Sequence, residues 1–112
     1  MTLDEYQTAA RRTAQYPDQV RLLYPVLKLA GEAGEVSEKL GKLMRDEAWL
    51  PGRDLTSAQR HALAKELGDV LWYIASVAAD LDLTLDEIGA ANIAKLADRQ
   101  ARGKIQGSGD DR

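Results

Sequence analysis

Apolar residues recur at steps of three and four along most of the chain, and they nowhere alternate with a period of two over the length of a strand. The widest apolar stripe follows Thr56 and Ser57, either of which can cap a helix. Its members are Leu63, Leu67, Val70, Leu71, Ile74, Val77 and Leu81. This stretch is therefore predicted to be a long amphipathic helix.

A second long helix is predicted from about residue 20 to about residue 45. Pro25 stands near its first turns, where proline is tolerated, although it could instead mark a break. The apolar positions of this helix are Leu29, Ala33, Val36, Leu40 and Leu43. A shorter helix is expected to begin after Thr2, its N-cap, and to be halted near Tyr16 by Pro17.

The last helix is predicted from its start, where Thr84 and Glu87 have the spacing of a capping box, and it continues to about Ala101. Residues 46–55 contain a proline and a glycine and show no periodicity, so they are expected to form a loop. The predicted fold class is all-α. Because most connections are short, we expect an antiparallel four-helix bundle.

The chain of 112 residues has room for one domain, expected to comprise residues 1–102. Residues 103–112, with three glycines among polar residues, are expected to form a flexible tail. Ordering such a chain costs on the order of 150 kcal/mol, and a small domain buries a limited share of its surface. We therefore expect a homo-oligomer, in which a partner subunit contributes to stability.

Composition excludes several classes of protein. The 15 Lys and Arg against 18 Asp and Glu give a net charge of −3, without the basic excess needed to bind a nucleic acid duplex. The absence of cysteine excludes a disulfide framework, a thiolate zinc site and cysteine catalysis. The longest apolar run, residues 70–79, is far shorter than the roughly 20 residues that span a bilayer, and the N-terminus is unlike a signal peptide. A cytoplasmic protein without a membrane partner is expected.

Two pairs of carboxylates interrupt the two most apolar helices. Glu32 and Glu35 are three residues apart, and so are Glu66 and Asp69, which places each pair on one helix face. Solvated carboxylates at this spacing are common on helices, but here the flanking residues are apolar on both helices. Carboxylates turned inward cost several kcal/mol each and repel one another unless a cation compensates them. With oxygen ligands only, the pattern favours Mg²⁺, or alternatively Mn²⁺.

Cations surround these acids in the sequence. Lys28 precedes Glu32 by four residues and Lys39 follows Glu35 by four, so pairs within the helix are one interpretation. The other is that Lys28 contacts a phosphate of a ligand. The last predicted helix carries a polar stripe of Asn92, Lys95 and Arg99. The stripe is either solvated or, if it faces a metal bound by the acids, suited to neutralise a polyphosphate.

Three segments of the sequence carry a resemblance to a known family: LAGEAGEVSEKLGKLMRD, KELGDVLWYIA and NIAKLADRQARGKIQGSGDDR. Their ExxE and ExxD motifs and their order resemble the MazG-type nucleoside triphosphate pyrophosphohydrolases of the all-α NTP pyrophosphatase superfamily. The resemblance extends from about residue 22 to residue 112. It implies Mg²⁺-dependent conversion of a (d)NTP to the monophosphate and pyrophosphate, as nucleotide-pool house-cleaning, by a homodimer or a dimer of dimers.

The resemblance also assigns roles by position. Metal ligands would be Glu32, Glu35, Glu66 and Asp69. Phosphate-contacting positions would be Lys28, Lys95 and Arg99, with Asn92 a polar position of the same helix. Tyr73 matches a residue near the nucleotide, the alternative being a core or interface tyrosine. In metal-assisted hydrolysis, Glu35 is the first candidate to orient the attacking water and Glu38 the second, unless Glu38 is a surface acid.

One departure concerns the base pocket. Thirty residues separate Glu35 from Glu66, more than is usual in the family, because of the loop that carries Trp49. Trp49 could stack on a base, or it could plug the end of the bundle or a subunit interface. Trp72 is expected in the core or an interface. His61 lies two turns before Asp69, too far to share its metal, and is interpreted as a surface residue.

Other functions stay open at this point. Phosphoribosyl-ATP pyrophosphohydrolases typically carry a Tyr-His pair where this chain has Trp72 and Tyr73, and dUTP-specific helical relatives are usually longer. A noncatalytic helical interaction module with a structural metal is a third alternative, although such a site has no use for the phosphate-facing cations. Lys104, Ser108 and the glycines of the tail could fold over a bound nucleotide as a lid.

Overall fold

A computed structural model describes all 112 residues and contains four α-helices, one 3₁₀ turn and no strand. The elements are α1 (Leu3–Arg11), η1 (Asp18–Val20), α2 (Leu23–Asp46), α3 (Ser57–Asp80) and α4 (Leu85–Ala101). This confirms the all-α prediction and the loop between the two long helices. None of the helices combines the length and the apolar character that crossing a membrane requires.

Three of the helices begin with a capping box, as their sequences indicate. Thr2, Thr56 and Thr84 each accept a hydrogen bond from the backbone N–H three residues on, and the side chain at that position bonds back to the threonine N–H. Thr56, and not Ser57, is therefore the cap of α3. The predicted end of α4 at Ala101 is also confirmed.

Two boundaries differ from the prediction. The first helix ends at Arg11, because the C-cap Arg12 and the turn that follows leave the helix before Pro17 is reached. The second begins at Leu23, three residues later than expected, after Leu22 with a φ of 63°. Pro25 is buried in the first turn of α2 and does not break the helix. In a first turn the backbone N–H has no partner within the helix, so the missing N–H of proline breaks no hydrogen bond.

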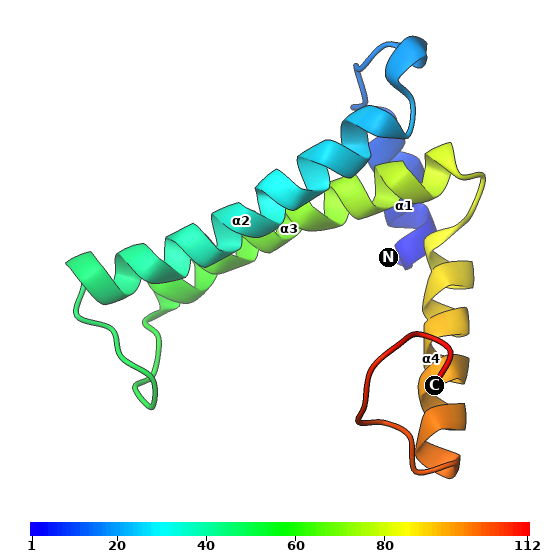
Figure 1. Ribbon diagram of the computed structural model, residues 1–112. Coiled ribbons are helices and arrows are strands. Elements are labelled where there is room, and N and C mark those ends of the chain that lie inside the picture. Colours follow the sequence, from blue (N-terminus) through cyan, green and yellow to red (C-terminus); the bar gives the residue numbers. More distant parts are fainter.

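Within one chain the helices form only part of the expected four-helix bundle. In Figure 1, α2 and α3 run antiparallel as a long hairpin, α1 crosses the end of the hairpin where α3 finishes, and α4 points away from it. The prediction of antiparallel neighbours is thus confirmed for α2 and α3, and the bundle arrangement is supported only in part, because α4 packs mainly against α1 and the end of α3. The cause lies in the short connection, where Asp82 has a left-handed φ of 58° that ends α3 and redirects the chain.

The small core lies where α1, α3 and α4 meet. Ala75, Ala78 and Leu85 are buried there, and Tyr6 and Ile74 pack against them. Gln7 ties the junction together, because its amide donates to the carbonyls of Ala75 and Leu83 and its carbonyl accepts from the N–H of Leu85. The first turn of α4 is therefore held against α1 while the rest of α4 projects outward.

Most of the apolar surface of the chain is uncovered. Only nine of the 112 residues are buried, and the radius of gyration is 17.1 Å, against about 13 Å for a compact chain of this length. On α4, Ile93 is 67% exposed and Leu96 is 40% exposed. The helices thus present apolar faces that no other part of the same chain covers.

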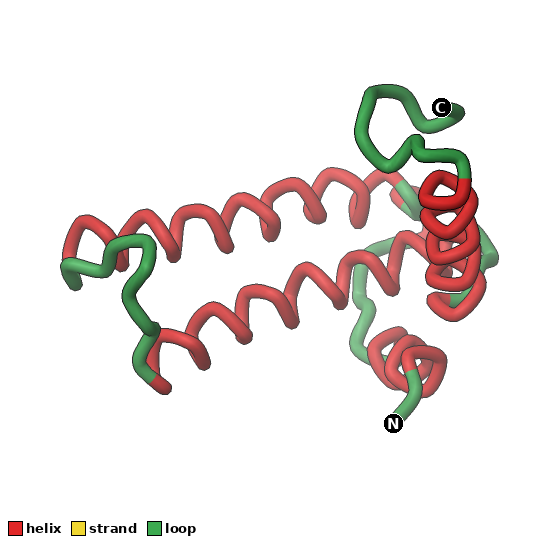
Figure 2. The backbone as a smooth tube through the Cα atoms, turned by 90° about the horizontal axis from the view of Figure 1, so that it is seen from below, coloured by secondary structure: helices red, strands yellow, loops and turns green.

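The tail after α4 folds back along that helix in Figure 1, and Figure 2, which views α4 nearly end-on, shows the tail as a loop beside it. Arg99 donates to the carbonyls of Gly109 and Asp110, and Arg102 donates to the carbonyl of Arg112. The guanidinium of Arg112 in turn donates to the carbonyls of Lys104, Ile105 and Gly109. The tail thus lies against α4 and not over the two long helices that carry the predicted metal ligands.

Candidate metal centre

Three predicted metal ligands meet between the two long helices. Glu32 on α2 and Glu66 and Asp69 on α3 each offer a carboxylate oxygen, and these oxygens lie within 4.8 Å of one another. The spacing of three residues keeps Glu66 and Asp69 on one face of α3, and the antiparallel partner helix brings Glu32 opposite them. Glu32 and Glu66 are half-buried and Asp69 is exposed, so the cluster, here called the acidic cluster, opens to solvent.

The charge of the acidic cluster is incompletely neutralised. Its one ion pair joins the Lys39 Nζ to Glu66 Oε1 at 3.4 Å, and Glu32 and Asp69 have no ion pair or hydrogen bond within the chain. Lys39 therefore pairs across the hairpin and not with Glu35 on its own helix. Three carboxylates beside one lysine leave a net charge of about −2 at neutral pH, which a divalent cation would cancel.

The two carboxylates proposed for general-base chemistry lie further along α2. Glu35 is exposed and is not one of the three residues that meet, since it is one helical turn nearer to the hairpin loop than Glu32. Glu38 is also exposed and pairs with Lys42 at 3.3 Å, as a surface acid would. Of the four residues expected to converge, three do so within one chain, and Glu35 does not.

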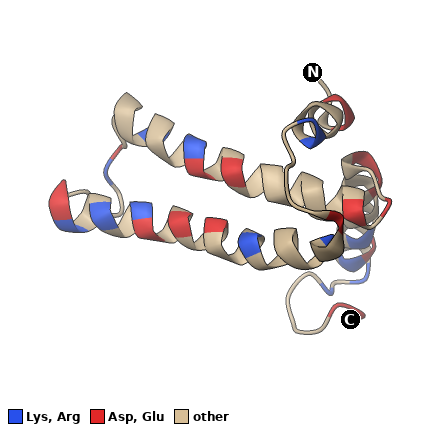
Figure 3. Cartoon of the chain, turned by 90° about the horizontal axis from the view of Figure 1, so that it is seen from above, with Lys and Arg blue, Asp and Glu red and all other residues tan.

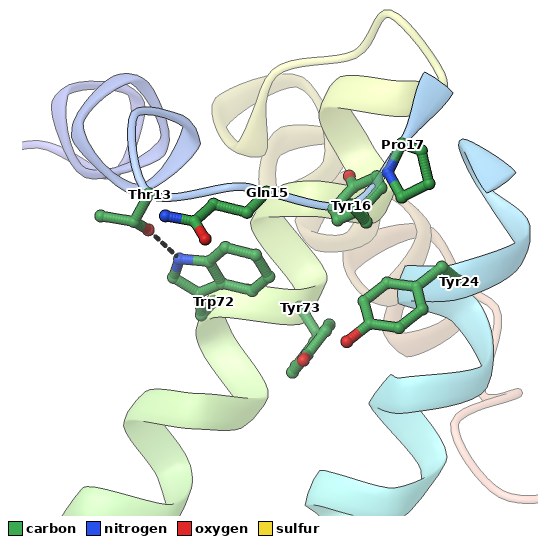
Figure 4. A pocket seen from close by; sticks show the side chains of 7 residues that line it. All are labelled: Thr13, Gln15, Tyr16, Pro17, Tyr24, Trp72 and Tyr73. Atoms are coloured by element: carbon green, nitrogen blue, oxygen red, sulfur yellow. Dashed lines mark hydrogen bonds between the residues drawn. The ribbon is translucent and has the colours of Figure 1, made fainter. Parts of the chain in front are cut away.

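Two adjoining cavities lie beside the acidic cluster at the α1 end of the hairpin. The cavity that contains the acids has a volume of about 370 Å³ and is lined by Thr13, Glu32, Asp69, Trp72 and Tyr73. The second, here called the aromatic cavity, has a volume of about 450 Å³. Its lining residues are Thr13, Gln15, Tyr16, Pro17, Tyr24, Trp72 and Tyr73, drawn in Figure 4. Three residues line both cavities, so the two cavities adjoin each other.

Tyr73 stands between the acids and the aromatic cavity. Burial, the neighbouring Tyr24 and the nearby charges of Glu32 and Asp69 raise the pKa of Tyr73 to about 12. Its hydroxyl is therefore protonated at any physiological pH and is available as a donor. The structure places this tyrosine beside two of the predicted metal ligands, Glu32 and Asp69, as its position one turn after Asp69 predicts.

Trp72 lines both cavities and is not part of the small core, so of the two expected places, core or interface, the interface stays a prediction. The indole is half-buried, its Nε1 donates to Thr13 Oγ1 at 2.8 Å, and its ring meets Tyr73 edge-on with centroids 4.8 Å apart. The physical reason is that this face of α3 is covered only by the segment after α1, which leaves the indole partly open.

The segment after α1 is the part of the site that the sequence did not reveal. Thr13, Gln15 and Tyr16 have no helical spacing, and Tyr24 falls in a first turn whose apolar pattern begins later. The one feature of the sequence that indicates this part of the site is the presence of two tyrosines, Tyr16 and Tyr24, close to Pro17. Their side chains meet only because α1 crosses the hairpin end.

A buried carboxylate fixes this segment. The side chain of Asp80 is 0% exposed and accepts hydrogen bonds from Tyr16 Oη at 2.8 Å, Leu22 N at 2.9 Å and Arg11 Nη2 at 3.2 Å, with Arg21 Nε at 3.6 Å. Burial alone would raise the pKa of Asp80, but these bonds and the two guanidinium charges lower it below its ordinary value. Tyr16 and the start of α2 are held in place together.

The predicted phosphate-binding cations are divided between two regions. Lys28 is exposed on α2, one turn before Glu32, and has no ion pair. Lys95 and Arg99 lie on the half of α4 that points away from the hairpin, so one chain does not bring them to the acidic cluster. Figure 3 shows acidic and basic residues following one another along both hairpin helices, while α4 stands apart.

The tail contacts the cations of α4. Lys95 Nζ lies 3.5 Å from Asp110 Oδ1, and Arg99 Nη2 lies 3.6 Å from the same oxygen. Arg99 is 5% exposed, and its Nε has no hydrogen-bond partner. Asn92 and Lys95 line a shallow cavity of about 320 Å³ together with Ile88 and Ala91. A ligand that engages these cations has to displace the Asp110 carboxylate.

Trp49 and His61 are the two remaining residues from the sequence analysis. Trp49 lies in the loop at the far end of the hairpin from the aromatic cavity, and its Nε1 donates to the carbonyl of Arg53 at 3.1 Å. Within one chain it does not reach a base held beside Trp72. His61 is exposed, as predicted.

Comparison with known proteins identifies the family of the chain. The MazG nucleotide pyrophosphohydrolase domain matches residues 23–103, which include the three carboxylates and the whole of α4. The Gene 37 protein of Mycobacterium phage L5 is 43% identical over 118 aligned residues that cover all of both chains. No solved structure matches the chain. The chain belongs to the MazG family of nucleotide pyrophosphohydrolases, a class of enzymes that generally depends on a divalent metal.

Proposed function

We propose that this protein is a Mg²⁺-dependent nucleoside triphosphate pyrophosphohydrolase, which converts a (d)NTP and water to the monophosphate and pyrophosphate. The observation that carries the proposal is the acidic cluster, three carboxylates with oxygens within 4.8 Å and one lysine partner, beside a cavity large enough for part of a nucleotide. Oxygen-only donors suit Mg²⁺, and Mn²⁺ is the alternative. Family membership supports the same reaction class.

The residues of the chain have separable tasks in this reaction. Glu32, Glu66 and Asp69 would hold the metal ion, which when bound supplies Lewis-acid polarisation of the phosphate oxygens. Glu35, one turn from Glu32 and free of ion pairs, would orient the attacking water and accept its proton. Glu38 is the weaker candidate for that task because Lys42 already pairs with it. Lys28 and the hydroxyl of Tyr73 would donate to phosphate oxygens.

A second copy of the chain would complete the site. The apolar face of α4 is exposed, and its cations lie away from the acidic cluster of their own chain. In a homodimer or a dimer of dimers, a partner could cover that face, and the stripe of Asn92, Lys95 and Arg99 could meet the acids of the other subunit. Light scattering after gel filtration should give twice or four times 12.3 kDa for the wild type. Ile93→Glu should shift the mass toward the monomer.

The assay that tests the function measures pyrophosphate release from a panel of canonical and modified (d)NTPs with Mg²⁺. Wild type should release pyrophosphate, and Glu35→Gln and Glu32→Gln should not, while Asp54→Asn in the hairpin loop should match wild type because Asp54 is exposed and has no ion pair. Release confined to phosphoribosyl-ATP or to dUTP would narrow the substrate. No metal-dependent release from any nucleotide would favour a noncatalytic module.

A further inference from the structure

The aromatic cavity has a wall of ring faces. Tyr16 and Tyr24 lie with centroids 5.2 Å apart, Tyr24 and Tyr73 with centroids 6.3 Å apart, and Trp72 meets Tyr73 edge-on. Figure 4 shows the rings of Tyr16 and Tyr24 across the cavity from Trp72, with Tyr73 between them. A planar aromatic ligand is the chemistry that such a wall favours, because it can stack on several rings at once.

Two polar groups of this wall are already engaged within the chain. The indole N–H of Trp72 donates to Thr13, and the hydroxyl of Tyr16 donates to Asp80. They therefore support the rings and do not select among ligands. The cavity walls are held in place by these bonds before any ligand arrives.

Gln15 is the one lining residue with a side-chain amide. Its side-chain amide makes no hydrogen bond within the chain, and Figure 4 shows it beside Trp72 at the edge of the cavity. A glutamine amide offers both a donor and an acceptor, so it can pair with the hydrogen-bonding edge of a heterocycle. Its donor and acceptor thus place Gln15 to distinguish one planar ligand from another by the pattern of hydrogen-bonding groups on the ligand.

The aromatic cavity adjoins the cavity of the acidic cluster. It shares Thr13, Trp72 and Tyr73 with the cavity of the acidic cluster, and Tyr73 lies one helical turn, about 6 Å, beyond Asp69. A ligand that fills both cavities needs a flat aromatic group at one end and a metal-binding anionic group at the other. A nucleotide has this composition.

We propose that the aromatic cavity binds the nucleobase of the substrate triphosphate and that the Gln15 amide selects the base by hydrogen bonding to its edge. This inference rests on the proposed function and adds a specificity-determining residue to it. The base stacks among Trp72, Tyr16 and Tyr24, and the phosphates extend past Tyr73 to the acidic cluster. Trp49, at the other end of the hairpin, takes no part in base selection.

The experiment uses Gln15→Glu, because a carboxylate accepts hydrogen bonds and does not donate them. The substrates are the pairs CTP and UTP, and ATP and ITP, in which an amino group of the first member takes the place of a carbonyl at one ring position. Gln15→Glu should raise the amino-to-carbonyl ratio of kcat/KM on the order of tenfold in each pair that wild type hydrolyses. The matched control is Gln19→Glu, four residues on, exposed and outside the cavity, which should keep the wild-type ratio.

A binding measurement separates this inference from the proposed function. In a Trp49→Phe background, Trp72 is the only tryptophan, so its fluorescence reports the cavity. Nucleoside monophosphates without metal should quench it with saturation, and Tyr24→Ala should weaken this binding about tenfold. Unchanged ratios in Gln15→Glu, or no saturable quenching, would overturn the base pocket even if wild type releases pyrophosphate. Quenching without pyrophosphate release from any nucleotide would instead overturn the proposed function and leave the base pocket supported.

Discussion

Two sets of carboxylates on the same hairpin differ in how completely the chain neutralises their charge. At the end of α3, the side chain of Asp80 is 0% exposed and four groups of the chain surround its oxygens. In the middle of the hairpin, Glu66 is 19% exposed, Asp69 is more open, and Lys39 is the one cation paired with the three acids. The chain thus satisfies one carboxylate completely and leaves three others short of positive charge.

This difference separates structural from functional charge. A buried carboxylate that its own chain neutralises holds elements together, and here it joins α1, the start of α2 and α3. Clustered carboxylates that the chain does not neutralise destabilise the metal-free protein and stabilise a bound cation. The two sets should therefore respond in opposite ways to substitution, to pH and to Mg²⁺.

The largest expected effect is on catalysis. Asp69→Asn should lower kcat/KM for the hydrolysed nucleotide about 1,000-fold, which is about 4 kcal/mol of transition-state stabilisation. Without metal, its free energy of unfolding should equal or exceed that of wild type, because one repelling charge is removed. Steady-state kinetics and urea unfolding measure the two effects, with Asp54→Asn as the control. A clear loss of metal-free stability in Asp69→Asn would contradict a purely functional role.

Asp80→Asn should show the reverse pattern. It should lower the free energy of unfolding at pH 7 by about 3 kcal/mol, since the guanidinium groups of Arg11 and Arg21 lose the carboxylate charge that they pair with. Because the pKa of Asp80 is lowered in the folded state, its contribution is present above the ordinary carboxyl pKa of about 4 and is lost as the pH falls through the folded value. Urea unfolding from pH 7 down to pH 3 should show the difference shrinking. A difference that stays constant would assign the loss to packing and not to charge.

Addition of Mg²⁺ should also distinguish the acidic cluster from Asp80. Mg²⁺ at ten times its dissociation constant should stabilise wild type by about 1.4 kcal/mol, by mass action on the folded state. Asp80→Asn and Asp54→Asn should keep this increment, and Asp69→Asn should lose it. Thermal unfolding with and without Mg²⁺ makes the comparison. An equal shift in all four proteins would mean that the metal binds elsewhere.

The smallest expected effect comes from the tail. Removal of all residues after Ala101 should raise KM or lower kcat a few-fold, because Lys104 and Ser108 could no longer fold over a bound nucleotide and Arg99 would lose its cover. Nucleotide kinetics on the shortened chain measure this. Unchanged kinetics would remove the lid hypothesis, and a lower KM would show that Asp110 competes with the substrate for Lys95 and Arg99.

Local features of the sequence predicted the helices well. The capping boxes at Thr2, Thr56 and Thr84 act within three residues, so local spacing is sufficient to find them. The i, i+3 pair of Glu66 and Asp69 shares a helix face for the same local reason. The predicted first helix is too long because Pro17 is not what stops it: the helix already ends at Arg11.

What the sequence determined by itself was therefore the set of helices, the acidic residues and the family. Only the tertiary structure decided which of those residues meet: Glu32 joins Glu66 and Asp69, Glu35 does not, and α4 carries Lys95 and Arg99 away from their own acids. It also assembled the aromatic cavity from the segment after α1 and two other helices. The physical reason is that helix periodicity is a local property, while crossing angles depend on turns such as that at Asp82 and on distant partners such as Gln7 and Asp80.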